Sequence, residues 1–90
     1  MRRNSAKAIR RDVGRRIAEE RTARGWTQEH LAERLRVSTR YLQSVEAGRE
    51  NLTIDSLATI GNVLGVKAAN LFDKPEAPSA RSRRSRSAGT

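Results

Sequence analysis

The chain has 90 residues, a formal net charge of +9 and no cysteine. This length makes one small domain with a modest core, and no disulfide supports that core. No window is apolar over the length of a membrane span, and no apolar run follows the basic start MRRNSAKAIRRD. We therefore expect neither a transmembrane segment nor a signal peptide, and predict a cytoplasmic protein.

The positive charge lies at the two ends of the chain. Residues 1–16 carry seven Lys and Arg and one acid, and residues 74–90 carry five and one, whereas residues 17–73 hold seven basic and eight acidic side chains. Basic ends on a nearly neutral body favour arms that bind a polyanion such as nucleic acid. Solvated tails that only keep a small protein soluble would give the same pattern.

The first helix is predicted from apolar spacing. Ile9, Val13 and Ile17 recur every four residues, which is one face of a helix. We expect this helix to begin at residue 9 or 12 and to end at residue 24. Residues 1–8 are then predicted to form a basic arm.

Capping residues predict the next two helices. Thr27 is a typical N-cap residue and begins a second helix over residues 28–35. A third helix is predicted to begin at residue 38 or 39 and to end at residue 47, before Gly48.

The remaining elements complete an all-helical domain. Thr53 caps a predicted fourth helix over residues 54–64, and VKAANLF, residues 66–72, predicts a short fifth helix. Residues 74–90 contain many Ser and Arg and no apolar residue larger than Ala, which is typical of a disordered tail. No strand pattern is present. We therefore predict an all-α domain of five helices over residues 9–73.

The second and third predicted helices are separated by a tight turn of three residues. The small Ala32 allows the two helix backbones to approach closely, while Leu42 and Val45 bury one face of the third helix. The opposite face is polar and not acidic. This arrangement predicts a helix-turn-helix, whose second helix enters the major groove of DNA and reads base edges. The outward residues are Thr39, Arg40, Gln43, Ser44 and Ala47.

Residues 13–72 resemble the Cro/repressor-like, or xenobiotic-response-element-like, helix-turn-helix family. The motifs that carry the resemblance are RGWTQEHLA, VSTRYLQSVEAG and NLTIDSLATIGNVLGV, in this order. The segment RYLQSVEAGRENLTIDSL is also similar to controller proteins of restriction–modification systems, and similar segments occur in phage repressors and antitoxins. The resemblance implies a transcriptional regulator that binds double-stranded DNA as a homodimer at a pseudo-palindromic operator.

The resemblance also implies roles for individual residues. Base-reading positions correspond to Thr39, Arg40, Gln43 and Ser44. Positions that contact the DNA backbone correspond to Gln28, Tyr41, Arg49 and Asn51. A pair that ties the first helix to the end of the third corresponds to Arg21 and Glu46. Two alternatives stay open, because Tyr41 could be surface packing and the pair could be two independent surface charges.

Arg40 is our first choice for direct readout, since a guanidinium group fits guanine best. Three positions depart from the family's usual pattern. Arg36 lies in the turn where Gly or Asn is common and where φ is often positive, so we expect mild strain there. Lys67 replaces the usual Ser or Thr cap of the fifth helix, and His30 occupies a common capping-box position, where we expect a plain surface residue.

Partners and chemistry complete the predictions. Five short helices leave more apolar residues than one core needs, so we expect the homodimer surface on the fourth and fifth helices. Two alternatives remain: an antitoxin-type protein-interaction module that also binds DNA, and RNA binding through the arms. The single His and the lack of Cys and of catalytic motifs argue against an enzyme, and we expect no cofactor, metal or small-molecule ligand. The candidates for the dimer surface are Ile60, Val63, Leu64, Val66, Leu71 and Phe72.

Overall fold

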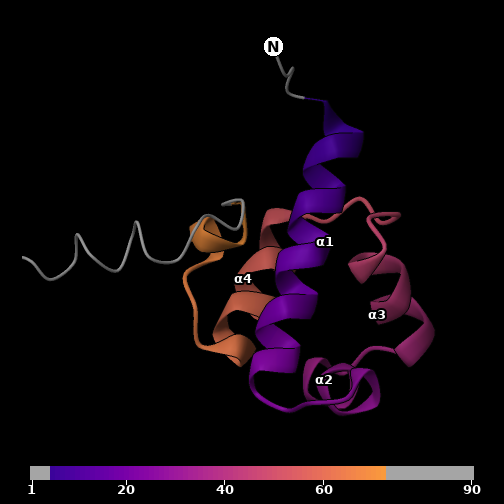
Figure 1. Ribbon diagram of the computed structural model, residues 1–90, viewed down its shortest axis with the longest axis vertical. Coiled ribbons are helices and arrows are strands. Elements are labelled where there is room, and N and C mark those ends of the chain that lie inside the picture. The colour runs from indigo at the N-terminus through magenta and orange to yellow at the C-terminus, as the bar shows by residue number, and fades with distance from the viewer. Residues whose placement is uncertain (1–4, 73–90) are drawn as a thin grey trace, which may run out of the picture.

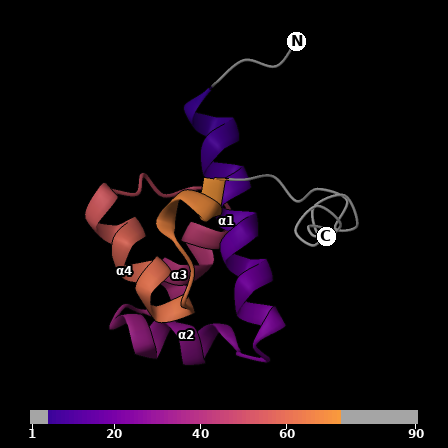
Figure 2. The same cartoon turned by 90° about the vertical axis from the view of Figure 1, so that its left-hand side faces the viewer.

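The computed structural model describes residues 5–72, which form four α-helices and one short 3-10 helix. The long α1 runs through the domain, with α3 on one side and α4 and η1 on the other, and α2 lies beneath (Figure 1). The turned view in Figure 2 shows the same packing of α2 and α4 beside α1. No strand occurs between residues 5 and 72, so the predicted all-α class is confirmed. The elements are α1 (Ala6–Ala23), α2 (Gln28–Leu35), α3 (Thr39–Glu46), α4 (Ile54–Leu64) and η1 (Ala68–Phe72).

Every α-helix begins after a Ser or Thr that caps it. In each case the side-chain hydroxyl accepts a hydrogen bond of 3.0 Å from the backbone N–H three residues further on. Such a cap satisfies one of the unpaired N–H groups of the first turn and contributes about 1 kcal/mol. The four capping residues are Ser5, Thr27, Ser38 and Thr53.

Helix α1 begins earlier than its apolar spacing predicts. It starts at Ala6, not at residue 9 or 12, because Ser5 caps it and the following Ala and Lys residues are good helix formers. Residues 6–8 of the predicted basic arm are therefore helical. The rest of that arm and the predicted tail, residues 1–4 and 73–90, lie outside the described residues.

The predicted fifth helix is a five-residue 3-10 helix rather than an α-helix. Val66 and Lys67 precede it, and the N–H of Asn70 donates to the carbonyl of Lys67 over 2.9 Å, which is the three-residue spacing of a 3-10 turn. Leu71 returns to the core as expected and is fully buried. Phe72 does not, because 47% of its surface is exposed.

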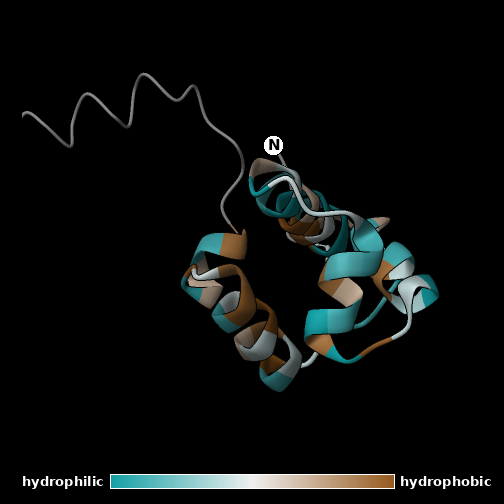
Figure 3. Cartoon of the chain, turned by 90° about the horizontal axis from the view of Figure 1, so that it is seen from below, coloured by the Kyte–Doolittle hydropathy of each residue, from teal (hydrophilic) through white to brown (hydrophobic). Residues whose placement is uncertain are grey.

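The core lies where the inner faces of all five helices meet. Figure 3 shows apolar residues and hydrophilic residues on different sides of the helices. Trp26 follows α1 and packs, half-buried, against this core. No described helix combines the length and the hydropathy needed to cross a membrane. The fully packed residues are Val13, Ile17, Leu31, Ala32, Leu42, Val45, Leu57, Ile60, Leu64 and Leu71.

Helices α1 and α3 touch through their backbones at Gly14. A Cβ atom added to this residue would lie 2.4 Å from the carbonyl oxygen of Val45 and 2.7 Å from that of Glu46. Both neighbours are backbone atoms near the end of α3, so they cannot rotate away as a side chain could. The absence of a side chain at Gly14 therefore sets how closely α3 packs on α1.

We expect Gly14→Ala to destabilise the domain by about 1–3 kcal/mol, because the new methyl group overpacks the contact with α3. Helix propensity alone predicts the opposite sign, since Gly in a helix costs roughly 0.5–1 kcal/mol relative to Ala. Chemical denaturation followed by circular dichroism measures the difference. The control is Glu19→Ala on the exposed side of α1, which should leave stability nearly unchanged. A Gly14→Ala variant as stable as the natural chain would contradict the close contact.

Candidate nucleic-acid interface

The turn between α2 and α3 depends on one residue with left-handed backbone geometry. Arg36 has φ 63° and ψ 43°, so the predicted position of positive φ is confirmed. The N–H groups of Arg36 and Val37 donate to the carbonyls of Glu33 and Ala32 over 3.1 Å and 3.0 Å, which satisfies two carbonyls at the end of α2. A non-glycine residue in this region costs roughly 1–2 kcal/mol, so the turn is strained.

Packing of α2 on α3 determines which face of α3 points outward. Ala32 is 2% exposed, and its small side chain lies in the core beside Leu31. Leu42 and Val45 bury the inner face of α3. The side chains at the remaining helical positions therefore point away from the core.

The outward face of α3 carries the predicted base-reading residues. Arg40 and Gln43 are exposed, while Thr39 and Ser44 are half-exposed. The ion pairs found within residues 5–72 do not include Arg40, so its guanidinium group is available to a ligand. The structure thus brings all four residues onto one short, eight-residue helix.

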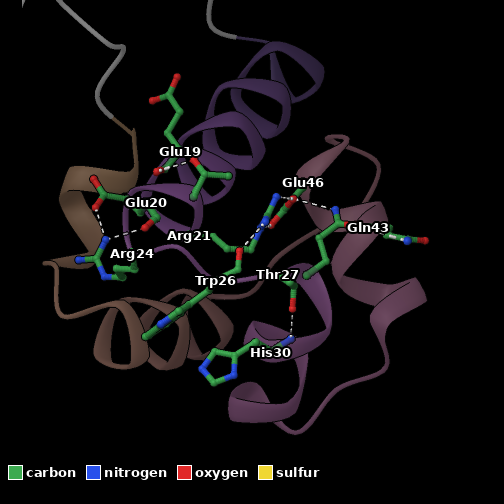
Figure 4. Close-up of polar contacts among 11 residues, drawn as sticks. Glu19, Glu20, Arg21, Arg24, Trp26, Thr27, His30, Gln43 and Glu46 are labelled. Atoms are coloured by element: carbon green, nitrogen blue, oxygen red, sulfur yellow. Dashed lines mark hydrogen bonds and ion pairs between the residues drawn. The ribbon is translucent and has the colours of Figure 1, made fainter.

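Arg21 of α1 and Glu46 of α3 form a two-pronged ion pair (Figure 4). The Nε and Nη2 atoms of Arg21 donate to Oε2 and Oε1 of Glu46 over 2.7 Å and 3.1 Å. The third prong of Arg21, Nη1, donates to the carbonyl oxygen of Trp26 over 2.8 Å. The side chains of Arg21 and Glu46 are only 14% and 7% exposed. The pair is therefore a largely buried link between helices and not two independent surface charges.

Gln28 connects this ion pair to the outward face of α3. Its Nε2 atom donates to Oε1 of Glu46 over 2.9 Å, and its Oε1 atom accepts from Nε2 of Gln43 over 3.4 Å. The carboxylate of Glu46 therefore receives three hydrogen bonds, from two other helices. Sequence spacing did not predict the contact between Gln28 and Gln43, because it joins residues from two different helices.

The beginning of α2 is suited to an anion. Gln28 is the first residue of this helix, and Thr27 caps it. The unpaired N–H groups and the positive end of the helix dipole both favour a phosphate at such a position. Gln28, half-exposed, is placed where it could contribute a side-chain amide to the same phosphate.

The loop after α3 presents a second basic position. Arg49 is exposed, and its N–H donates to the carbonyl of Ser44 over 2.9 Å. Gly48 precedes it with φ 79°, and a Cβ added there would lie 2.8 Å from Cα of Arg11. The exposed Arg11 on α1 therefore lies near Arg49, although our sequence analysis assigned Arg11 no role at this interface.

The structure places Tyr41 and Asn51 away from one another. Tyr41 is half-buried and lines a hollow of about 280 Å³ between α3 and α4, together with Val37 and Thr59. Asn51 is exposed and lines a different hollow of about 250 Å³, between α1, α4 and η1. Packing therefore accounts for part of the surface of Tyr41.

The other candidates have surface roles. His30 is exposed and meets the ring of Trp26 edge-on at 5.0 Å, while the guanidinium carbon of Arg34 lies 4.7 Å from the centre of the same ring. Among residues 5–72, no three His, Cys, Asp or Glu side chains gather as metal ligands would.

Comparison with known proteins supports the same assignment. The chain is 38% identical over 63 residues to a protein of Sinorhizobium fredii (strain NBRC 101917 / NGR234), the uncharacterized HTH-type transcriptional regulator y4dJ. The match covers 70% of this chain and 82% of that protein.

Two solved structures resemble the model over the helical domain. The restriction–modification controller protein C.AhdI from Aeromonas hydrophila is 31% identical, with a TM-score of 0.68, over 72% of this chain and 98% of that one. The master regulator for biofilm formation SinR, solved in complex with DNA, is 34% identical, with a TM-score of 0.63, over 68% of this chain and 98% of that one.

A family model described as helix-turn-helix matches residues 17–71, which is more than half of the chain. The match begins within α1 and ends in η1, so it includes the turn and every helix described above. These comparisons point to transcription factors and not to enzymes. The chain therefore belongs to the helix-turn-helix family HTH_3.

Proposed function

We propose that this chain, a DNA-binding transcriptional regulator, recognises a pseudo-palindromic operator as a homodimer. One observation carries the proposal: the outward face of α3 is polar, and the one acid of that helix, Glu46, is neutralised by Arg21. A helix with an unpaired carboxylate would repel phosphate, whereas this helix presents no unpaired negative charge.

Base readout is assigned to the outward residues of α3. The fork of Arg40 fits O6 and N7 of guanine, and the hydroxyl groups of Thr39 and Ser44 can donate to or accept from base edges. Gln43 has the amide that adenine recognition requires.

Backbone contacts are assigned to the residues around α3. Gln28 at the start of α2 and Arg49 after α3 are the two strongest candidates, because one extends a helix N-terminus and the other is an exposed cation. Tyr41 and Asn51 stay predictions as backbone contacts.

The homodimer surface needs revision at the level of residues. Ile60, Leu64 and Leu71 were candidates, but they are at most 5% exposed and belong to the core, so they are not free to meet a second copy. Val63 and Val66 are half-buried against the same core.

Three large apolar side chains are exposed instead, and we call them the apolar patch. Ile54 is 78% exposed, Phe72 47% and Ile9 39%. All three line the hollow of about 250 Å³ between α1, α4 and η1. We propose that two copies pair through this patch, since a two-fold dimer buries the same surface of both copies and exposed apolar groups favour such burial. α4 and η1 thus remain the proposed dimer elements, joined by the start of α1.

The similarity to C.AhdI supports a controller role in a restriction–modification system, and the similarity to SinR supports a regulator of other genes. Both levels of identity are close, so the proposal stops at operator binding. An antitoxin-type function would use the apolar patch for a different protein, and the oligomeric state distinguishes the two.

The dimer is tested by sedimentation of the full chain with and without operator DNA. We expect a dimer that binds two half-sites whose centres lie roughly 10 bp apart. Ile54→Lys should weaken dimerisation at least about tenfold, because it places a charge in the apolar patch. Asn62→Lys, which adds the same charge at an exposed site of the same helix, is the control and should remain dimeric. A natural chain that stays monomeric and protects a single half-site would exclude the homodimer and favour a different protein partner.

Readout by α3 is tested by comparing Arg40→Ala with Arg49→Ala. Arg40→Ala should cost on the order of 1–3 kcal/mol on the operator, with preference lost mainly at one base pair in each half-site. Arg49→Ala should weaken binding evenly over all sequences, as the loss of a phosphate contact does. Binding isotherms against single-base variants of the operator measure both. Uniform weakening by Arg40→Ala would make it a backbone contact and move readout to Thr39 and Ser44.

The basic tail is tested by deleting residues 76–90, which removes four Arg. Affinity for all DNA sequences should fall together, and the dependence of affinity on salt should become less steep because fewer counterions are released. The melting temperature should not change. A truncated chain with a different preferred sequence would show instead that the tail takes part in base recognition.

A further inference from the structure

The side-chain amide of Gln43 has a defined orientation, and its origin can be followed back through three residues. Gln43 donates from Nε2 to Oε1 of Gln28 over 3.4 Å, and Gln28 donates from Nε2 to Oε1 of Glu46 over 2.9 Å. A carboxylate only accepts hydrogen bonds, so Gln28 must turn its NH₂ group towards Glu46. Its carbonyl oxygen then faces Gln43, and Gln43 must meet that oxygen with its own NH₂ group.

The starting point of this chain of contacts is held firmly. Arg21 donates twice to Glu46, and both side chains are largely buried. The carboxylate therefore keeps its position and its role as acceptor. The last contact is different, because 3.4 Å is at the long end of hydrogen-bond distances and Gln43 is exposed. The contact favours one orientation of the Gln43 amide without locking it.

We propose that Gln43 is an adenine-reading residue and that Glu46, acting through Gln28, sets the direction in which it reads. The proposal rests on the function proposed above. A primary amide has two N–H groups. The N–H that points away from the amide's own oxygen is the one free to meet Gln28, and the other N–H then lies beside that oxygen. This edge donates to N7 and accepts from N6–H₂ of adenine.

Orientation matters because an amide that flips reads a different pattern. With its oxygen and NH₂ group exchanged, Gln43 would offer an acceptor where adenine N7 needs a donor, and a donor where N6–H₂ needs an acceptor. A freely rotating Gln43 would therefore accept several base pairs. Gln28 is in this proposal a positioning residue, and its loss should change selectivity and not only affinity.

The experiment uses the full chain and its preferred sequence, selected from random DNA. The readout is the ratio of dissociation constants for the four base pairs at each operator position. The position read by Gln43 is the one whose preference disappears in Gln43→Ala. We expect adenine there, preferred by roughly tenfold in the natural chain.

Gln28→Ala should reduce that adenine preference to near the level of Gln43→Ala, while the preference at the base pair read by Arg40 is unchanged. In the double variant, the Gln28 substitution should change no base preference further, because its partner is gone. Arg49→Ala is the matched control: it should weaken binding evenly and keep the adenine preference. Melting temperatures of all variants show that the fold is retained.

Two results would overturn the inference. If Gln28→Ala weakens binding evenly and keeps the full adenine preference, Gln28 contacts phosphate only and does not orient Gln43. If Gln43→Ala alters no base preference, Gln43 does not read bases. Both results leave operator binding through α3 intact, whereas a natural chain without any preferred sequence would overturn the proposed function as well.

Discussion

The carboxylate of Glu46 joins three helices of this domain. It accepts two hydrogen bonds from Arg21 of α1 and one from Gln28 of α2, while its own residue ends α3. An unpaired carboxylate at this depth would cost about 3–5 kcal/mol, and it would also repel DNA from the helix that is to approach it. Because all its partners are present, the same acid ties α3 to the rest of the domain. The position of the reading helix thus depends on a charge that DNA never has to meet.

Much of this fold could be predicted because its signals are local. Thr27 and Thr53 mark the beginnings of two helices, and the structure has caps at both. The positive φ of Arg36 was expected from its position in the turn. The beginning of α1 was missed because apolar spacing starts only at Ile9, whereas Ser5 and the helix-forming residues after it decide where the helix begins.

Features that depend on the approach of distant segments were not predictable from spacing. The pairing of Arg21 with Glu46 was expected only from a family resemblance, since nothing local connects residues 25 positions apart. The contact of Gln28 with Gln43 had no sequence signal at all. The apolar residues of α4 and η1 show a related limit. Their periodicity identifies an inner face, but whether that face meets the chain's own core or a second copy depends on packing, and Ile60 and Leu71 meet the core.

The contact of Gly14 with the carbonyl oxygens of Val45 and Glu46 has a consequence for the evolution of this protein. Backbone atoms, together with the inward side chains of α3, hold that helix against α1. The outward side chains take no part in this attachment, so they can be exchanged at little cost in folding free energy. Arg40 can change in this way independently of its neighbours, whereas Gln43 is linked to Gln28 and would be expected to change with it. New operator preferences could therefore arise on an unchanged scaffold, by single steps at some positions and by paired steps at others.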